Sequence, residues 1–238
     1  MAEPGNMTEP GTSGQLLPAA AAPKTVQTVI DTQHGMWGAP GQDVSGFADL
    51  TRRFDLPGLT AGPLDDWFGL VDNVIAKQLP EAVEARLVDR DELTLRVRRE
   101  YLTQLAQLLR DDPYLRFEVC VSVSGVHYPD QVGAELHVVY HLLSITHNRR
   151  LRLEVAVPET DPHVPSVTRI WPMVNYHERE TYDMFGVIFD GHPALTRILM
   201  PDDWVGYPQR KDYPLGGVEV QFKGARIAPP DQRRSYAR

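Results

Sequence analysis

The chain has 238 residues, 42% of them hydrophobic and 24% charged, and a formal net charge of −8 at pH 7. That length supports one domain with extensions or two small domains. The acidic balance argues against a nucleic-acid binder that works by phosphate neutralisation. The charge is uneven, because from Val205 onward seven basic residues stand against three acidic ones, a net charge of about +4 that leaves about −12 for the rest.

Cys120 is the only cysteine, so the chain alone can build neither an internal disulfide nor a cysteine-ligated cluster. Its apolar neighbours predict a small buried strand residue. The N-terminus has an acidic start and no long apolar stretch, so we expect no secretory signal. The segment 16–23 is too short and too broken by proline to span a bilayer. We therefore expect a cytoplasmic or peripheral protein.

Residues 1–62 are rich in proline, glycine, alanine, threonine and serine and contain few large apolar side chains. Such a segment buries too little surface to offset its ordering entropy. The composition therefore predicts a low-complexity N-terminal extension that is mobile by itself.

The core is expected to begin near Leu64 with a helix over 67–79. Asp65 or Asp66 can cap it, apolar residues recur at helical spacing, and Pro80 ends it. Alternation, helical periodicity and turn residues define seven more elements. In chain order these are strands at 82–88 and 93–97, a helix at 101–109, strands at 116–125, 135–145 and 149–157, and a helical region at 166–186 that restarts at Pro172 and closes at Gly186.

This order of elements predicts an α+β fold, with one largely antiparallel sheet and helices packed on one side. Strict alternation in the strand at 116–125 would place four apolar residues on one face: Phe117, Val119, Val121 and Val123. Repeated prolines beyond Pro201 exclude long regular elements. The predicted organisation is an extension at 1–62, a core domain at 63–204 and an extended basic arm at 205–238.

His137 and His141 have the spacing of a metal pair on a helix. Their segment is predicted to be a strand, however, so the two rings would lie on its more polar face, and a metal site is the less favoured interpretation. His177 and Glu180 reverse the Glu-x-x-His order of di-iron bundles, and the chain has no second copy.

The run 177–186 sets four charged side chains among large apolar ones. On a helix, Arg179 and Asp183 lie one turn apart, while Glu178 shares another face with aromatic residues. This pattern indicates either a buried segment with paired charges or a contact surface.

Paired carboxylates occur at Glu178 and Glu180 and again at Asp202 and Asp203. Acid–base chemistry would need one carboxyl in an apolar pocket and the other in a polar setting. No phosphate-binding loop or nucleophile motif stands out. A binding or scaffold protein is therefore favoured over a free-standing enzyme.

Four ordered blocks over about forty residues, at 178–186, 192–193, 197–204 and 210–215, resemble the signature of one family. It is the 30 kDa or C-type subunit of respiratory complex I, the proton-translocating NADH:quinone oxidoreductase. One departure is Thr196, where the resemblance would place a basic residue. The positions that carry the resemblance, with an expected interface or ion-pair role, are Glu178, Arg179, Glu180, Asp183, Phe185, Gly186, His192, Pro193, Arg197, Asp202, Asp203, Arg210, Lys211, Asp212 and Tyr213.

The resemblance implies a subunit of the peripheral arm, on the cytoplasmic side of the cell membrane and attached to it only through the complex. It implies no FMN, iron–sulfur cluster or catalytic residue in this chain, because other subunits hold those cofactors. The implied partners are the D-type subunit, which forms much of the quinone cavity, and the neighbouring iron–sulfur subunits. Quinone reduction by NADH then belongs to the assembly.

Two alternatives stay open. The chain could be the equivalent scaffold subunit of a membrane-bound hydrogenase or related dehydrogenase. It could also be an independent acid–base enzyme that uses Glu178 and Glu180. Assays of the purified complex and of the isolated chain would separate them.

Overall fold

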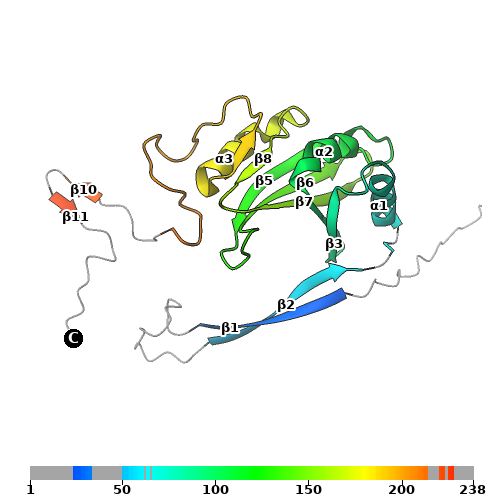
Figure 1. Cartoon of the computed structure of the whole chain (residues 1–238), viewed down its shortest axis with the longest axis horizontal. Coiled ribbons are helices and arrows are strands. Elements are labelled where there is room, and N and C mark those ends of the chain that lie inside the picture. Colours follow the sequence, from blue (N-terminus) through cyan, green and yellow to red (C-terminus); the bar gives the residue numbers. More distant parts are fainter. Residues whose placement is uncertain are drawn as a thin grey trace, which may run out of the picture.

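The centre of the molecule is a five-stranded sheet with strand order β3-β4-β7-β6-β5 (Figure 1). This computed structural model describes residues 24–33, 50–61, 63–64, 66–213, 220–222 and 225–227. Neighbouring strands are antiparallel except β4 and β7, which run parallel. The strands are β3 (Val83–Asp89), β4 (Glu92–Val97), β5 (Val119–His127), β6 (Leu136–Ser144) and β7 (Arg149–Val157).

One face of this sheet is apolar because alternate residues of the central strands point to it. Helices α1 (Asp66–Gln78) and α2 (Leu102–Asp111) lie on that side in Figure 1, and η1 (Arg99–Tyr101) leads into α2. The resulting core is formed by fully or almost fully buried side chains that include Leu93, Leu95, Leu102, Leu105, Leu109, Leu136, Val138, Tyr140, Leu151, Leu153 and Val155. The predicted α+β class, with a mostly antiparallel sheet, is confirmed.

The last helical region is shorter than predicted. Residues 163–165 form β8 (His163–Pro165), which pairs in parallel with β9 (Ile188–Asp190). Helix begins only at Pro172, with η2 (Pro172–Val174) followed by α3 (Asn175–Phe185). As expected, a glycine closes α3, because Gly186 has a φ of 79°, which favours a residue without Cβ.

A bulge in β5 changes the predicted alternation. The register with β6 shifts between Cys120 and Ser122. Cys120 and Val123 are therefore both buried, while Val121 is half exposed. A bulge adds one residue to a strand and so reverses the faces beyond it. The prediction that Cys120 is buried is confirmed, and the single-face alternation is wrong at Val121.

Two strands lie inside the segment interpreted as a low-complexity extension. β1 (Lys24–Gln33) and β2 (Leu50–Thr60) pair antiparallel as a separate two-stranded ribbon, which extends below the main sheet in Figure 1. Residues 24–33 are rich in threonine, valine and isoleucine, which favour a strand. The average composition of residues 1–62 does not reveal this local run. Thr60 ties the ribbon to the sheet, because its Oγ1 accepts a hydrogen bond from the Val88 N–H at 2.9 Å.

Within the predicted arm, β10 (Val220–Phe222) pairs antiparallel with β11 (Ala225–Ile227). Both strands are three residues long. The rest of the predicted arm after residue 213, like residues 1–23 and 34–49 of the predicted extension, lies outside the described residues.

Candidate functional site

The four charged residues of α3 have four different environments. Glu178 and Asp183 are completely buried, Arg179 is half-buried and Glu180 is exposed. The sequence indicated either paired burial or a contact surface for this helix. The structure buries Glu178 and Asp183 and leaves Glu180 at the surface.

Asp183 is the best-bonded carboxylate of the helix. One oxygen accepts a hydrogen bond from Arg197 Nη1 at 2.6 Å. The other accepts three consecutive backbone N–H groups, from Ile198, Leu199 and Met200, at 3.0, 2.7 and 2.9 Å. Burial by itself would raise the pKa of Asp183, but the hydrogen bonds from the backbone and from Arg197 outweigh it and hold that pKa below its ordinary value.

Arg197 closes the following segment around this ion pair. Its guanidinium also donates to the carbonyl oxygens of Asp183, Trp204 and Gly206, at 3.2, 3.1 and 3.1 Å. Residues 197–206 are therefore wound around one buried pair, and we call them the 197–206 loop. Asp202 and Asp203 are exposed on its outer side.

Arg179 fixes the start of the same loop. It donates to Thr196 Oγ1 at 3.0 Å and to the carbonyl oxygens of Thr196 and Arg197 at 3.2 and 3.1 Å. Thr196 is the residue at which the sequence departs from the family pattern. Its hydroxyl accepts from Arg179, and a basic side chain there would face that guanidinium with like charge.

Glu178 is buried without a cation beside it among the described residues. It accepts hydrogen bonds from Ser166 Oγ at 2.6 Å and from the Val167 N–H at 2.9 Å. Burial raises the pKa of Glu178 to about 7. These two bonds hold residues 166–167 against α3.

The geometry does not support an acid–base pair on α3. Glu178 has no exposed surface, so a substrate cannot reach it. Glu180 is exposed, and residues two apart on a helix point in different directions. Burial also raises the pKa of the Cys120 thiol to about 12, so this group is no ready nucleophile.

Residues 207–213 fold back as a strap over the end of α3. Gln209 N–H donates to the Met184 carbonyl at 3.1 Å, and Arg210 Nε donates to the Phe185 carbonyl at 2.6 Å. Both carbonyls belong to the last turn, which has no partners inside the helix. The Tyr207 ring covers Gly186, where a Cβ would lie 2.4 Å from it.

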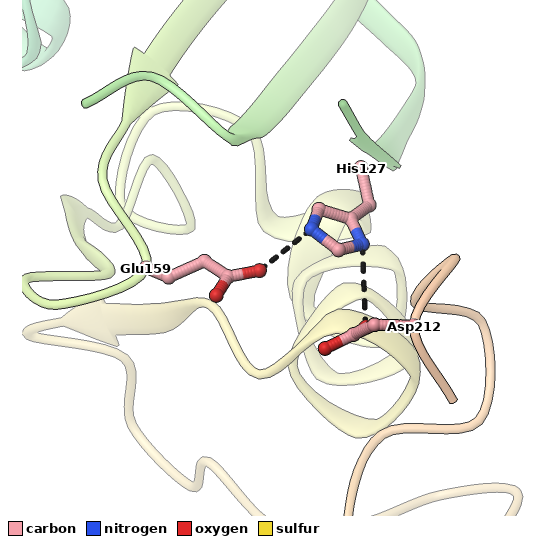
Figure 2. A group of neighbouring side chains, drawn as sticks. All are labelled: His127, Glu159 and Asp212. Atoms are coloured by element: carbon pink, nitrogen blue, oxygen red, sulfur yellow. Dashed lines mark ion pairs between the residues drawn. The ribbon is translucent and has the colours of Figure 1, made fainter. Parts of the chain in front are cut away.

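His127, at the end of β5, contacts the strap, and Figure 2 shows its ring beside Asp212. The ring is 2% exposed, its Nδ1 accepts the Lys211 N–H at 2.9 Å, and its Nε2 lies 2.6 Å from Glu159. Asp212 lies 3.6 Å from Nδ1. An N–H that donates to Nδ1 requires a lone pair there, which places the ring proton on Nε2.

The same three side chains are a poor metal site. Glu159 and Asp212 face different nitrogens of the ring, as Figure 2 shows, and the backbone N–H of Lys211 occupies the Nδ1 lone pair. A metal needs ligand atoms that converge on one point. We therefore interpret His127 as a structural clamp. No sequence pattern indicated it, because its partner lies 84 residues away.

The strap contains four of the residues that carry the family resemblance. An interface or ion-pair role is expected for Arg210, Lys211, Asp212 and Tyr213. In the structure Arg210 and Lys211 bond to this chain's own Phe185 and His127, and Tyr213 donates to the Val205 carbonyl at 3.4 Å. Contacts with this chain's own core therefore continue past residue 204 to Tyr213, while the side chains of Lys211 and Asp212 are exposed.

His192 supports the start of α3. Its Nε2 donates to the Asn175 carbonyl at 3.2 Å, and its Nδ1 accepts the Ala194 N–H at 3.1 Å. Burial lowers the pKa of His192, in agreement with a neutral ring. Pro193 lies exposed in the same turn. Within this chain, His192 thus links the start of α3 to the turn that follows β9.

On the helix-free face of the sheet, a hollow of about 390 Å³ is lined by His141, Ser122 and Arg152 among others. Arg152 Nε donates to His141 Nε2 at 3.2 Å, so the proton of a neutral His141 ring is on Nδ1, facing Ser122 Oγ at 3.1 Å. The ring therefore donates to the serine and cannot act as its base.

His137 lies on the same face but has separate partners. Its Nδ1 is 2.5 Å from a Glu154 oxygen, and its Nε2 is 2.9 Å from the Ala134 carbonyl. The two histidines considered as a metal pair are thus engaged independently.

Comparison with known proteins decides the family. Residues 95–219 match the family described as respiratory-chain NADH dehydrogenase, 30 Kd subunit. The chain is 53% identical to the C-type subunit of NADH-quinone oxidoreductase from a Nocardioides species, over 99% of this chain and 100% of that protein. It is 58% identical to the same subunit from Mycolicibacterium gilvum, over 87% and 95%. The chain belongs to this family.

The resemblance seen in the four sequence blocks is thereby confirmed, and the matched range contains all of them. A chain from the structure of the membrane-bound sulfane sulfur reductase, an archaeal respiratory membrane complex, shares the fold. Its TM-score is 0.54 at 23% identity, over 63% of this chain and 87% of that chain. No helix in the described part of the 30 kDa family chain is long and apolar enough to cross a membrane.

Replacing Glu178 by glutamine should remove a pH dependence of stability. The folded-state pKa of about 7 lies above the ordinary value of 4.5. The stabilisation from this group is therefore complete below about pH 4.5 and is lost as the pH rises through 7, on the order of 3 kcal/mol in all. Urea unfolding of the full chain between pH 5 and 9 should show this loss in the wild type and not in Glu178→Gln. Glu180→Gln is the exposed control, and an equal slope in Glu178→Gln and wild type would contradict the assignment.

Asp183→Ala should destabilise the free chain by about 3–5 kcal/mol, because it leaves Arg197 and three backbone N–H groups buried without an acceptor. Chemical denaturation measures the loss. Asp202→Ala, which removes an exposed carboxylate from the same loop, should change the unfolding free energy by less than about 0.5 kcal/mol. Equal effects of the two substitutions would show that the Asp183 pair is not what holds the loop.

Proposed function

We propose that this chain is a non-catalytic scaffold protein, the C-type subunit in the peripheral arm of the proton-translocating NADH:quinone oxidoreductase. The observation that carries the proposal is the 53–58% identity to curated proteins of that name over most of the chain. The arrangement of the signature residues supports it. Each charged group that is buried in α3 bonds to the protein itself, and Glu180 is the one carboxylate of that helix left at the surface.

In this proposal the electron carriers, FMN and the iron–sulfur clusters, are held by other subunits, and quinone is handled by the complex. The single cysteine, buried and with a raised pKa, is in keeping with that division. The chain sits on the cytoplasmic side of the cell membrane and associates with it only through the complex. Its main partner is the D-type subunit, with the neighbouring iron–sulfur subunits beside it.

The equivalent scaffold subunit of another membrane-bound complex is the competing function. A chain of the sulfane sulfur reductase complex shares this fold at 23% identity. Similarity at that level indicates a common fold and does not distinguish between functions. The proposal is tested by purifying the complex through a tag on this chain. Co-purification of NADH:quinone oxidoreductase activity supports it, and hydrogen evolution without NADH oxidation contradicts it.

The purified chain should be colourless and redox-silent after incubation with iron, sulfide and FMN. The reason is that it offers one buried thiol and no recognisable phosphate or flavin motif. A visible absorbance spectrum is sufficient to check this. Stoichiometric flavin or cluster bands would show that this chain holds a cofactor itself.

The part of the C-terminal arm that follows Tyr213 should contribute to assembly of the complex. We propose that residues 214–238, with five basic residues against two acidic ones, lie across a neighbouring subunit, chiefly the D-type subunit. Truncation after Tyr213 should leave the melting temperature of the free chain unchanged while reducing assembly and quinone-reductase activity. A fully assembled and active complex that contains the truncated chain would contradict the proposed role of residues 214–238.

Truncation after Gly206 is the matched comparison, because it removes the strap as well. It should destabilise the free chain by on the order of 3 kcal/mol, at about 1 kcal/mol for each of three lost hydrogen bonds. Those bonds are the ones to Met184, Phe185 and His127. If assembly is lost after truncation at Gly206 but not after truncation at Tyr213, the loss would therefore be due to impaired folding and not to removal of the arm.

A further inference from the structure

The 197–206 loop has its polar groups inside and its apolar side chains outside. Its backbone N–H groups and Arg197 turn inward to Asp183. The apolar side chains turn to solvent, with Ile198 37%, Leu199 61% and Val205 86% exposed. A loop that folds only for its own stability would bury such side chains, so this surface suits a contact with another molecule.

The loop is also held in one conformation. Asp183 accepts four hydrogen bonds from it, Arg197 at its start binds the Trp204 and Gly206 carbonyl oxygens at its end, and Tyr213 donates to Val205. A surface that is already ordered loses little conformational entropy on binding. The exposed side chains are therefore presented to a partner in a fixed arrangement.

The negative charges on the loop indicate which kind of partner surface it could bind. Asp202 and Asp203 lie exposed in the turn that joins Pro201 to Trp204, between the apolar side chains. Neither carboxylate forms an ion pair with any residue in the described ranges. Two carboxylates beside the apolar side chains would be repelled by an anionic lipid surface and attracted by lysine or arginine on a protein.

We propose that Ile198, Leu199 and Val205, flanked by Asp202 and Asp203, dock into an apolar groove rimmed by basic side chains on an adjacent subunit of the same complex. This docking face rests on the proposed function for the existence of that complex. The docking face goes beyond the proposed function because it assigns two different roles to residues of the family signature. Asp183 and Arg197 shape the loop from inside, and the five outer residues make the contact.

The test compares Leu199→Ser/Val205→Ser with Val132→Ser in the assembled complex. Val132 is 91% exposed on a different loop, so its substitution removes a similar apolar group away from the docking face. Amounts of each tagged chain recovered in the complex are measured on native gels, together with the melting temperature of the free chain. The double variant should be incorporated at least about tenfold less than wild type, while Val132→Ser and both melting temperatures stay unchanged.

A second variant tests the charge independently of folding. Asp202→Lys/Asp203→Lys changes only exposed positions, and it should also reduce incorporation by about tenfold or more. If both variants are incorporated like wild type, the docking face is wrong. If wild type itself fails to co-purify with NADH:quinone oxidoreductase subunits, the proposed function fails instead.

Flotation of the free chain with anionic phospholipid vesicles gives the remaining outcome. The chain should stay unbound. Vesicle binding by wild type that is lost in Leu199→Ser/Val205→Ser would make the loop a lipid contact and overturn the proposal.

Discussion

The buried pair of Asp183 and Arg197 is the interaction on which the C-terminal half of the domain depends. The carboxylate is fully buried, and a cation and three backbone N–H groups satisfy it. A buried pair adds little net stability, yet loss of one member is costly because the other remains charged and desolvated. Through the carbonyl of Gly206, Arg197 also fixes the point from which the strap crosses Gly186. Helix end, loop and strap are thus set by one pair of charges.

The two buried carboxylates of α3 show how environment decides the behaviour of one functional group. Asp183 receives an arginine and several N–H groups, and the balance lowers its pKa. Glu178 receives a hydroxyl and a single N–H, so burial dominates and raises its pKa to about 7. A raised pKa in a cleft would suggest a general acid. Here the group has no access to solvent, so the same shift describes a structural joint between α3 and residues 166–167.

Sequence patterns predicted the elements whose cause is local. Period-two alternation and helical spacing placed the five central strands and α1 and α2, and Gly186 closed α3 as expected. What the sequence could not provide depends on contacts between distant residues. Residues 163–165 pair with β9 before the helix begins, a bulge turns Val121 outward, and His127 accepts a hydrogen bond from Lys211, 84 residues away. For the candidate site, the pattern could not tell Glu178, which is buried, from Glu180, which is exposed.

The signature of this family therefore combines two kinds of constraint that look alike in a sequence. Asp183, Arg197 and Gly186 are required by the fold, since each is buried or conformationally fixed by bonds within the chain. Asp202, Asp203 and Leu199 have no such internal requirement on their side chains, because they are exposed on a loop whose shape is set from beneath. Loss of an inner residue must disturb both folding and assembly, whereas loss of an outer one can disturb assembly alone. In the proposed docking face, that asymmetry follows because the exposed residues lie on the outside of a loop shaped by a buried ion pair.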